Sequence, residues 1–256
     1  MVHDLFGLTG ASPIGFLAAL GMLRVLSSDR GLDVRLWWRN GHAVIEGLDP
    51  SEAVEEIMAN MADRGTAPEF NWSDSPRKVD PEAYREVCGQ MMDDPRGLAF
   101  MAGWASDAVV RKQGISVTRM DMTSGQQKLL RDLRQLAKTI ETEHISSALM
   151  GGPYGHQPSF GLDPVAVRFH AHEHKAPTKS PPPGKPGLVW LAFESIPLHP
   201  VVPISPYRAQ TTGWRINPEP AYVWPIWDAM LTLEEIRLLR CLPIDRLKER
   251  PGVSEI

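Results

Sequence analysis

The sequence predicts an α+β fold, and three observations support that prediction. Ser12, Asp49 and Asp80 each stand directly before a proline, which is the pattern of an N-cap followed by the first residue of a helix. Short apolar runs alternate with these helix starts. Asn40-Gly41 marks a tight hairpin turn between two of the apolar runs. The 256 residues are 43% hydrophobic and 23% charged, which is enough apolar sequence for a sizeable core.

The first 60 residues are predicted to form a strand, a helix, a hairpin and a second helix. We expect strands at 5–8, 34–38 and 43–46, a helix at 13–26 and another from residue 50. The helix at 13–26 is apolar nearly all round, so we expect it to be buried in a core. Its apolar run is shorter than the ~20 residues of a membrane span. This order of elements resembles one half of a ferredoxin-like fold.

The rest of the chain is predicted as a helical middle followed by a proline-rich region of short strands. We expect helices at 81–92, 98–109, 124–140 and 232–240, and strands at 115–119, 189–193 and 222–227. Thr232 and Glu235 form a capping box at the start of the last helix. Gly- and Pro-rich stretches at 151–164 and 176–187 predict loops. We expect two domains, 1–150 and 151–256, with one continuous domain as the alternative.

The helix predicted at 124–140 is amphipathic and basic. At about 100° per residue, one arc is apolar and the adjoining arc is cationic. The apolar arc holds Leu129, Leu130, Leu133, Leu136 and Ile140, and the cationic arc holds Lys128, Arg131, Arg134 and Lys138. Residues 111–138 contain seven basic and two acidic side chains, so this segment carries +5 while the rest of the chain carries −9. Charge is therefore segregated along the chain, whose net charge is −4.

A nucleic-acid backbone is the natural partner of such a surface, because Lys and Arg contact phosphates without sequence preference. Ser124 and Gln127 form a capping box, and Ser124 and Gly125 would offer backbone N–H groups to an anion. An ordinary solvated helix face is the alternative. The predicted contacts are Arg111, Lys112, Arg119, Ser124, Gly125, Gln127, Lys128, Arg131, Arg134 and Lys138.

A histidine cluster offers an enzymatic alternative. His170, His172 and His174 alternate and would point the same way on a strand, where imidazoles suit zinc, nickel or copper. A metal-dependent nuclease or hydrolase would follow from such a site. The other interpretation is a polar edge beside the Pro-rich loop, and no HExxH or remote carboxylate motif supports a metal site. We therefore expect no metal and no cofactor.

Aromatic residues gather in the C-terminal region, among arginines and threonines. Aromatics interleaved with arginine can stack unpaired bases, whereas packing in a core is the alternative. The aromatic group is Trp214, Tyr222, Trp224 and Trp227. The further nucleic-acid contacts expected here are Arg208, Thr211, Thr212 and Trp214.

Several classes of protein are excluded by composition and motifs. Cys88 and Cys241 are too few and too far apart for a disulfide framework or a cysteine zinc site, which fits a reducing compartment and a cytoplasmic location. Residues 1–5 lack the basic region of a signal peptide. The chain has no phosphate-loop, dinucleotide-binding or serine-nucleophile motif, and nothing nominates a catalytic acid or base. We therefore expect a protein that is not an enzyme.

Several motifs resemble those of CRISPR-associated proteins from type I-G (formerly I-U) loci. Gly10–Arg24 (GASPIGFLAALGMLR) is similar to the NPxxFLAALGLLR start of those proteins, and Thr123–Lys128 (TSGQQK) to their TSGQQKFL segment. Four more motifs follow in the same order: Phe160–Pro164 (FGLDP), Trp190–Phe193 (WLAF), Thr211–Trp214 (TTGW) and Trp224–Trp227 (WPIW). Together they span nearly the whole chain.

The resemblance implies a large-subunit-like component of a Cascade-like, RNA-guided surveillance complex in antiviral defence. Such a protein would hold guide RNA or target DNA and pack against other effector subunits, while base pairing reads the sequence. The leading interpretation is a non-catalytic, nucleic-acid-binding subunit without a membrane partner. The chain has no helicase or nuclease motif, which excludes the helicase-nuclease effector. The remaining alternatives are the metal-dependent enzyme and a scaffold whose basic face docks an acidic protein.

Overall fold

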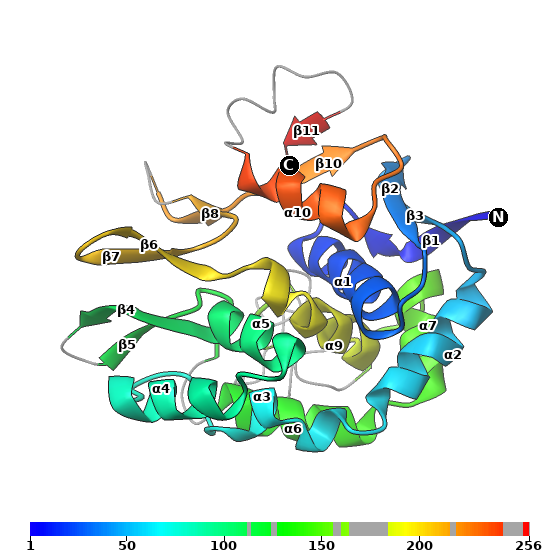
Figure 1. The fold of residues 1–256 in the computed structure, drawn as a ribbon. Coiled ribbons are helices and arrows are strands. Elements are labelled where there is room, and N and C mark those ends of the chain that lie inside the picture. The colour runs from blue at the N-terminus through cyan, green and yellow to red at the C-terminus, as the bar shows by residue number, and fades with distance from the viewer. Residues whose placement is uncertain are drawn as a thin grey trace, which may run out of the picture. The chain divides into compact units, whose positions relative to one another are not determined.

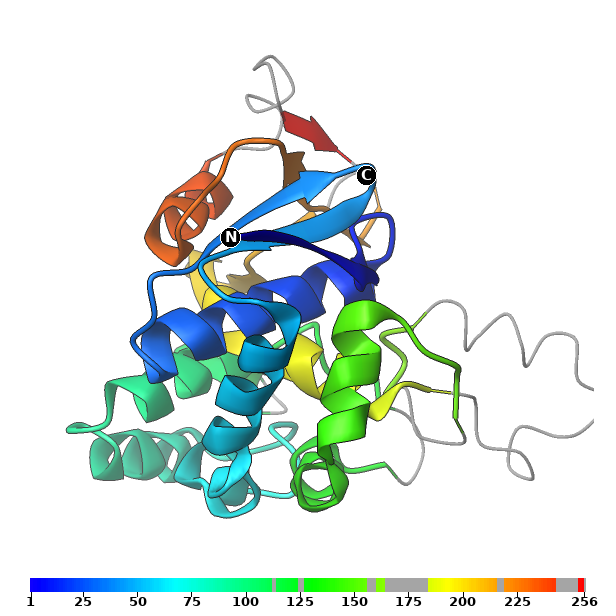
Figure 2. The same cartoon turned by 90° about the vertical axis from the view of Figure 1, so that its right-hand side faces the viewer.

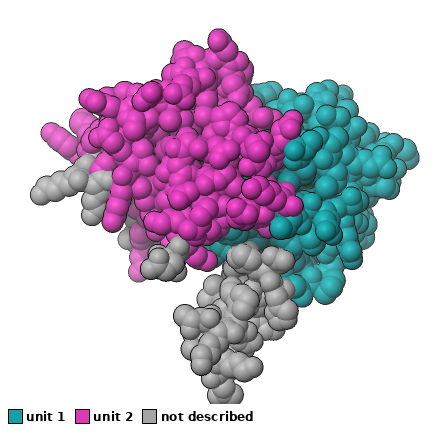
Figure 3. Space-filling view, turned by 90° about the horizontal axis from the view of Figure 1, so that it is seen from below, with its two compact units in different colours: residues 1–62, 139–195, 223–256 teal, residues 63–138, 196–222 magenta. Residues whose placement is uncertain are grey.

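The computed structural model describes residues 1–111, 114–123, 127–155, 160–163, 184–215, 219–242 and 253–255. Helices and small antiparallel sheets occur together, which confirms the α+β class (Figure 1). Two compact units are distinguished by colour in Figure 3. Unit 1 comprises residues 1–62, 139–195 and 223–256, and unit 2 comprises residues 63–138 and 196–222. Each unit therefore combines separate stretches of chain, whereas the sequence predicted a division near residue 150.

Unit 1 contains a three-stranded antiparallel sheet in the order β1-β3-β2. Its strands are β1 (Val2–Thr9), β2 (Arg35–Arg39) and β3 (His42–Glu46). Asn40 and Gly41 both have positive φ, 53° and 79°, as the Asn-Gly hairpin turn requires. The strand–helix–hairpin–helix order is as expected. No described strand pairs with the other edge of β1, so the ferredoxin-like assignment stays a prediction.

The helices of unit 1 are α1 (Pro13–Arg24), continued by a π-helical turn (Val25–Asp29), α2 (Pro50–Met61), α7 (Thr142–Met150), α9 (Pro186–Glu194) and α10 (Leu233–Cys241). Of these, α1, α2, α7 and α9 pack below the sheet, with α2 and α7 side by side, while α10 lies beside it (Figure 2). Two short strands, β10 (Pro225–Trp227) and β11 (Val253–Glu255), pair with each other. The capping box of Thr232 and Glu235 starts α10, as predicted.

The core of unit 1 is built on the contact between α1 and α9. Both helices are buried along nearly their whole length, and they approach closely at Gly21, where a Cβ would collide with the carbonyl oxygen of Leu191. The strand predicted at 189–193 is therefore wrong, because these residues lie in α9. A short run that is apolar on every side has no periodicity to separate a buried strand from a buried helix.

A buried ion network lies between α1 and α9. Arg24, 2% exposed, donates from two nitrogens to the Asp29 carboxylate, at 2.8 and 3.0 Å. The same guanidinium donates to the carboxylate and the backbone carbonyl of Glu194, whose side chain is fully buried. Removing one partner of such a network leaves an uncompensated charge in the core, which is strongly destabilising.

Trp224 and Trp227 belong to the core of unit 1, which confirms the core interpretation for these two residues. Their indole nitrogens donate to the carbonyl oxygens of Gly10 and Leu36, each at 2.9 Å. Both rings also pack against Phe16.

Unit 2 contains four α-helices and three antiparallel strand pairs among its described residues. The helices are α3 (Pro68–Asn71), α4 (Pro81–Gln90), α5 (Pro95–Trp104) and α6 (Leu129–Thr139). The strands are β4 (Ala105–Arg111), β5 (Gly114–Val117), β6 (Val201–Ser205), β7 (Arg208–Thr211), β8 (Trp214–Arg215) and β9 (Ala221–Tyr222), and short 3₁₀ turns lie at Arg64–Thr66 and Ile196–Leu198. The β4–β5 and β6–β7 hairpins lie side by side (Figure 1).

The core of unit 2 is aromatic. Phe70 packs against Phe100 at 5.3 Å and against Trp104 at 6.0 Å between ring centroids. Arg64, 1% exposed, lies over Phe70 and Phe100 and forms an ion pair with the fully buried Glu69.

The helix predicted at 98–109 is wrong in its second half. It ends at Trp104, and residues 105–111 form β4, because pairing with β5 outweighs the local apolar pattern. None of the helices in the described ranges is both long and apolar enough to cross a membrane.

Candidate functional site

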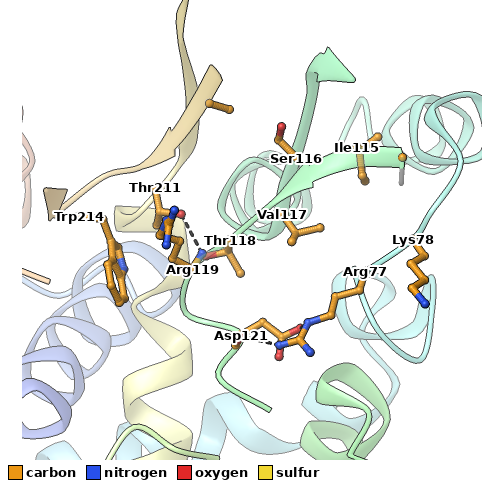
Figure 4. A pocket seen from close by; sticks show the side chains of 12 residues that line it. Arg77, Lys78, Ile115, Ser116, Val117, Thr118, Arg119, Asp121, Thr211 and Trp214 are labelled. Atoms are coloured by element: carbon orange, nitrogen blue, oxygen red, sulfur yellow. Dashed lines mark hydrogen bonds and ion pairs between the residues drawn. The ribbon is translucent and has the colours of Figure 1, made fainter. Parts of the chain in front are cut away.

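A pocket of about 440 Å³ lies within unit 2, open to solvent beside β5 and β7 (Figure 4). Three stretches of chain supply its walls: residues 77–78, residues 114–121 and residues 209–214. The pocket brings together two predicted groups that are far apart in sequence. Arg119 comes from the basic segment, and Thr211 and Trp214 come from the aromatic group. The volume lies within the roughly 300–1,000 Å³ that is common for ligand sites.

Three cations and one carboxylate line this pocket. Arg77 and Lys78 come from the loop before α4, and Arg119 follows β5. The carboxylate of Asp121 is buried, and Arg77 Nε lies 2.8 Å from its Oδ2 while Arg77 Nη2 donates to the Asp121 carbonyl at 2.7 Å. Thr123 donates to the other carboxylate oxygen from its backbone N and from its hydroxyl. Arg77 and Asp121 neutralise each other, so Lys78 and Arg119 leave the pocket positively charged.

Lys78 has an unusual backbone conformation. Its φ of 60° lies in the left-handed region, which a residue other than glycine adopts at a cost of order 1–3 kcal/mol. The neighbouring Val79 carbonyl accepts a hydrogen bond from Ile115 N, so β5 holds the loop in place. Lys78 is exposed at the rim, on the opposite side of the pocket from Trp214 (Figure 4).

Trp214 and Arg119 form one end of the pocket. The guanidinium carbon of Arg119 lies 5.8 Å from the centroid of the Trp214 ring, in a cation–π arrangement. The backbone N of Arg119 donates to Thr211 Oγ1 at 2.9 Å, which anchors the arginine to β7. Trp214 Nε1 is buried and has no hydrogen-bond partner in the part of the chain that the structure describes.

The hydroxyls of the pocket wall are buried and engaged with the backbone. Ser116 Oγ donates to the Val109 carbonyl at 2.8 Å, and Thr118 Oγ1 accepts from Met120 N at 3.2 Å. Thr211 Oγ1 accepts from Arg119 N, as described above. The exposed fractions of these three residues are 8%, 3% and 1%. They therefore shape the wall, and the charged and aromatic side chains face the opening.

The basic helix is present, but it begins later than predicted. Residues 127–128 are not helical and α6 starts at Leu129, so the predicted helix start at Ser124 is wrong. The apolar arc is buried as expected, from Leu129 to Ile140. Lys128, Arg131 and Lys138 are exposed. A hydrogen bond to Asp132 raises the pKa of the Arg131 guanidinium above its ordinary value, so the group stays charged.

Arg134 is engaged inside unit 2 and not in an open cationic face. Its Nη1 donates to the carbonyls of Phe70 and Ser73, at 2.6 and 2.8 Å, and its Nη2 donates to Asp74 at 2.7 Å. Its side chain is only 16% exposed. The segment that Arg134 holds leads directly to Arg77 and Lys78, so this arginine positions the pocket loop.

The start of α6 already has acceptors for its first backbone donors. Leu130 N and Arg131 N both donate to the Asp74 carbonyl, at 3.0 and 3.2 Å, and Lys128 N donates to Asp132. The helix N-terminus of α6 is therefore occupied by the chain itself. The anion contacts predicted for Ser124 and Gly125 lie outside the described residues.

The remaining predicted residues are dispersed. Gln127 is exposed before α6, Arg111 is the last residue of β4, and Lys112 lies outside the described residues. Arg208 begins β7 and does not line the pocket. Thr212 donates from its N and its hydroxyl to the Pro200 carbonyl, which closes a turn.

The histidine cluster is not part of the described structure. His170, His172 and His174 all fall within residues 164–183. Among the described residues, no group of three or more His, Cys, Asp or Glu is arranged to hold a metal ion.

Arg77 and Lys78 are the pocket residues that sequence reasoning missed. Residues 64–79 carry only loop signals, and no charge pattern sets these two cations apart. The contact between Arg77 and Asp121 joins residues 44 positions apart, which no local pattern reports. Comparison with known proteins adds no relative: no protein-family model and no curated protein sequence matches this chain.

Proposed function

We propose that the chain is a non-catalytic, nucleic-acid-binding protein whose pocket in unit 2 contacts the phosphate backbone. The observation that carries the proposal is the meeting of Lys78, Arg119 and Trp214 in one pocket. Exposed cations beside an aromatic face are the elements that nucleic-acid grooves combine. Arg77 takes part as the partner of Asp121, which it neutralises.

Exposed cations on α6 and directly before it extend the proposed surface beyond the pocket. Lys128, Arg131 and Lys138 are solvent-accessible, while Arg134 holds the loop that carries Arg77 and Lys78. Exposed lysine and arginine add to affinity through counterion release and carry no sequence information. We therefore assign phosphate contacts to these three residues, and a positioning role to Arg134.

We further propose that the protein acts within a type I CRISPR surveillance complex, in contact with guide RNA or target DNA and with other effector subunits. This context rests on the order of the sequence motifs. Thr211 and Trp214 of the TTGW motif line the pocket, so one of the motifs that carry the resemblance contributes residues to the proposed site. A cytoplasmic location belongs to the same proposal.

Two double variants test the phosphate contacts. Lys78→Ala with Arg119→Ala removes the charge of the pocket. Lys128→Ala with Lys138→Ala removes charge from α6 and from the residue directly before it. Each pair should weaken binding of a fluorescent 20-nucleotide strand in anisotropy titrations. Each lost phosphate contact should also flatten the slope of log K against log salt by about 0.7 for a single strand.

A matched control is Arg30→Ala with Arg237→Ala, which removes two cations from unit 1. Both arginines are partly exposed and pair with a neighbouring glutamate, Glu56 and Glu234. The control should bind like the unaltered protein. Unchanged affinity and salt slope in both test variants, with the fold intact by circular dichroism, contradicts the proposal.

A further inference from the structure

We infer that the pocket in unit 2 takes one unpaired nucleotide of a single strand, with its base stacked at Trp214 and its phosphates on Lys78 and Arg119. The inference rests on the proposed function and deepens it. It adds that the pocket distinguishes neither ribose from deoxyribose nor one base from another. The pocket thus distinguishes single-stranded from double-stranded nucleic acid.

The aromatic end of the pocket favours an unpaired base. Within a duplex, both faces of each base are covered by its neighbours, so only an unpaired base can lie against an aromatic ring or a guanidinium plane. Trp214 and the exposed Arg119 offer these two planar groups together. The guanidinium carbon of Arg119 lies 5.8 Å from the centroid of the Trp214 ring. Thr211 fixes the backbone of Arg119, so the arginine stays beside the ring.

The charges of the pocket suit the phosphates on either side of that base. Arg119 lies next to Trp214, and Lys78 lies on the opposite side of the opening (Figure 4). The left-handed backbone of Lys78 is a strained conformation, and the loop around it is held by β5 on one side and by Arg134 on the other. The backbone that carries the cation is therefore fixed before a ligand arrives, which lowers the entropic cost of binding.

The wall of the pocket offers little for reading the sugar. Discrimination of RNA from DNA requires a group that bonds the 2′-hydroxyl. The wall hydroxyls of Ser116, Thr118 and Thr211 are buried and bonded to backbone atoms. The carboxylate of Asp121 is engaged by Arg77 and Thr123.

The base edge is likewise read only weakly. The Trp214 Nε1–H group is buried and lies in the plane of the indole ring, so a base stacked on the face of that ring does not reach it. Stacking supplies the rest of the affinity, and stacking tolerates any base because each has a π-face.

Binding by the full chain can be compared for labelled 12-nucleotide oligouridine, oligodeoxythymidine and a 12-base-pair duplex. We expect the single strands to bind with affinities within about threefold of each other, and more tightly than the duplex. Trp214→Ala should weaken both single strands by roughly 5- to 150-fold, the effect of one lost base stack. Trp214→Phe keeps a ring and should retain most of the affinity. Duplex binding should be unchanged in both variants.

The outcomes separate this inference from the proposed function. If Trp214→Ala changes nothing while Lys78→Ala with Arg119→Ala weakens binding, the stacking inference is overturned and the nucleic-acid function stands. If neither variant changes binding, both fail. A tenfold preference for ribose or deoxyribose overturns the claim of sugar indifference.

Photocrosslinking of the unaltered protein covers the case in which Trp214→Ala does not fold. A strand containing 5-iodouridine should crosslink to the peptide that carries Trp214, as located by mass spectrometry. Crosslinks found only on other peptides overturn the inference.

Discussion

Arg134 is a cation on the basic arc of α6, yet its guanidinium bonds three acceptors within unit 2. Two of these are backbone carbonyls of residues 70 and 73, and the third is the carboxylate of Asp74. Helical periodicity correctly places the residue beside Arg131 and Lys138. It cannot report that a loop 60 or more residues earlier folds against the same position.

We predict that Arg134→Lys weakens single-strand binding through the pocket loop. A lysine ammonium cannot reproduce the planar fork that spans two carbonyls and a carboxylate, so Lys78 would lose its fixed position. The net charge is unchanged, but the loss of the Lys78 phosphate contact should flatten the salt slope by up to about 0.7. Anisotropy titrations should show a loss of affinity of a few-fold.

A double-mutant cycle tests whether Arg134 acts through Lys78. In the Lys78→Ala background, Arg134→Lys should have little further effect, because the residue that it positions is already gone. Lys128→Ala should instead add its full effect in the same background. Additive effects of Arg134→Lys and Lys78→Ala would show that the arginine does not act through the loop.

At the scale of single elements, the approach of α1 to α9 depends on a glycine. Gly21 has no side chain where the Leu191 carbonyl and Ser195 N come against it. A side chain there would separate two helices that are buried nearly all round. The sequence predicts α1 from its cap and proline. The need for glycine at position 21, however, comes only from the packing of α9 against α1.

We predict that Gly21→Ala destabilises the protein by about 1–3 kcal/mol or more in urea denaturation, as overpacking does. Alanine is the better helix former by about 1 kcal/mol, but a collision with backbone atoms cannot be relieved by a change of rotamer. The steric cost therefore exceeds the gain in helix propensity.

Gly89→Ala in α4 is the matched control for this prediction. A Cβ at Gly89 would meet nothing within 4 Å. This variant should be neutral or more stable, by up to about 1 kcal/mol. If the two variants changed the free energy of unfolding equally, the close approach of α1 and α9 would not explain the destabilisation.

At the scale of the whole molecule, each compact unit has its own core, and each core joins stretches that are distant in sequence. Unit 2 combines residues 63–138 with residues 196–222. Its aromatic core includes Phe100, which is fully buried and packs against Phe70 and Trp104. A cavity in this core should therefore destabilise both stretches of unit 2.

We predict that Phe100→Ala lowers the opening free energy of unit 2 amides by about 3–5 kcal/mol, the usual cost of such a cavity. Hydrogen–deuterium exchange should show reduced protection both in α5–β4 and in the β6–β7 hairpin. The β1–β3 sheet of unit 1 should keep its protection. An equal loss of protection in that sheet would contradict the division into two units.

The sequence by itself determined the features that depend on neighbours within a few residues. It placed the helix starts at Ser12, Asp49, Asp80 and Thr232, the hairpin at Asn40-Gly41 and the two faces of α6. Capping, the φ preference of Asn-Gly and helical periodicity all act within one or two turns of chain.

Only the tertiary structure decided the features that depend on distant partners. It made residues 189–193 a helix, since every side of that run is buried, and residues 105–111 a strand, since β5 pairs with them. It also built the pocket, because Arg77 meets Asp121 across 44 residues and Arg119 meets Thr211 across 92. No local pattern encodes such pairings, since they form only when both stretches fold into the same unit.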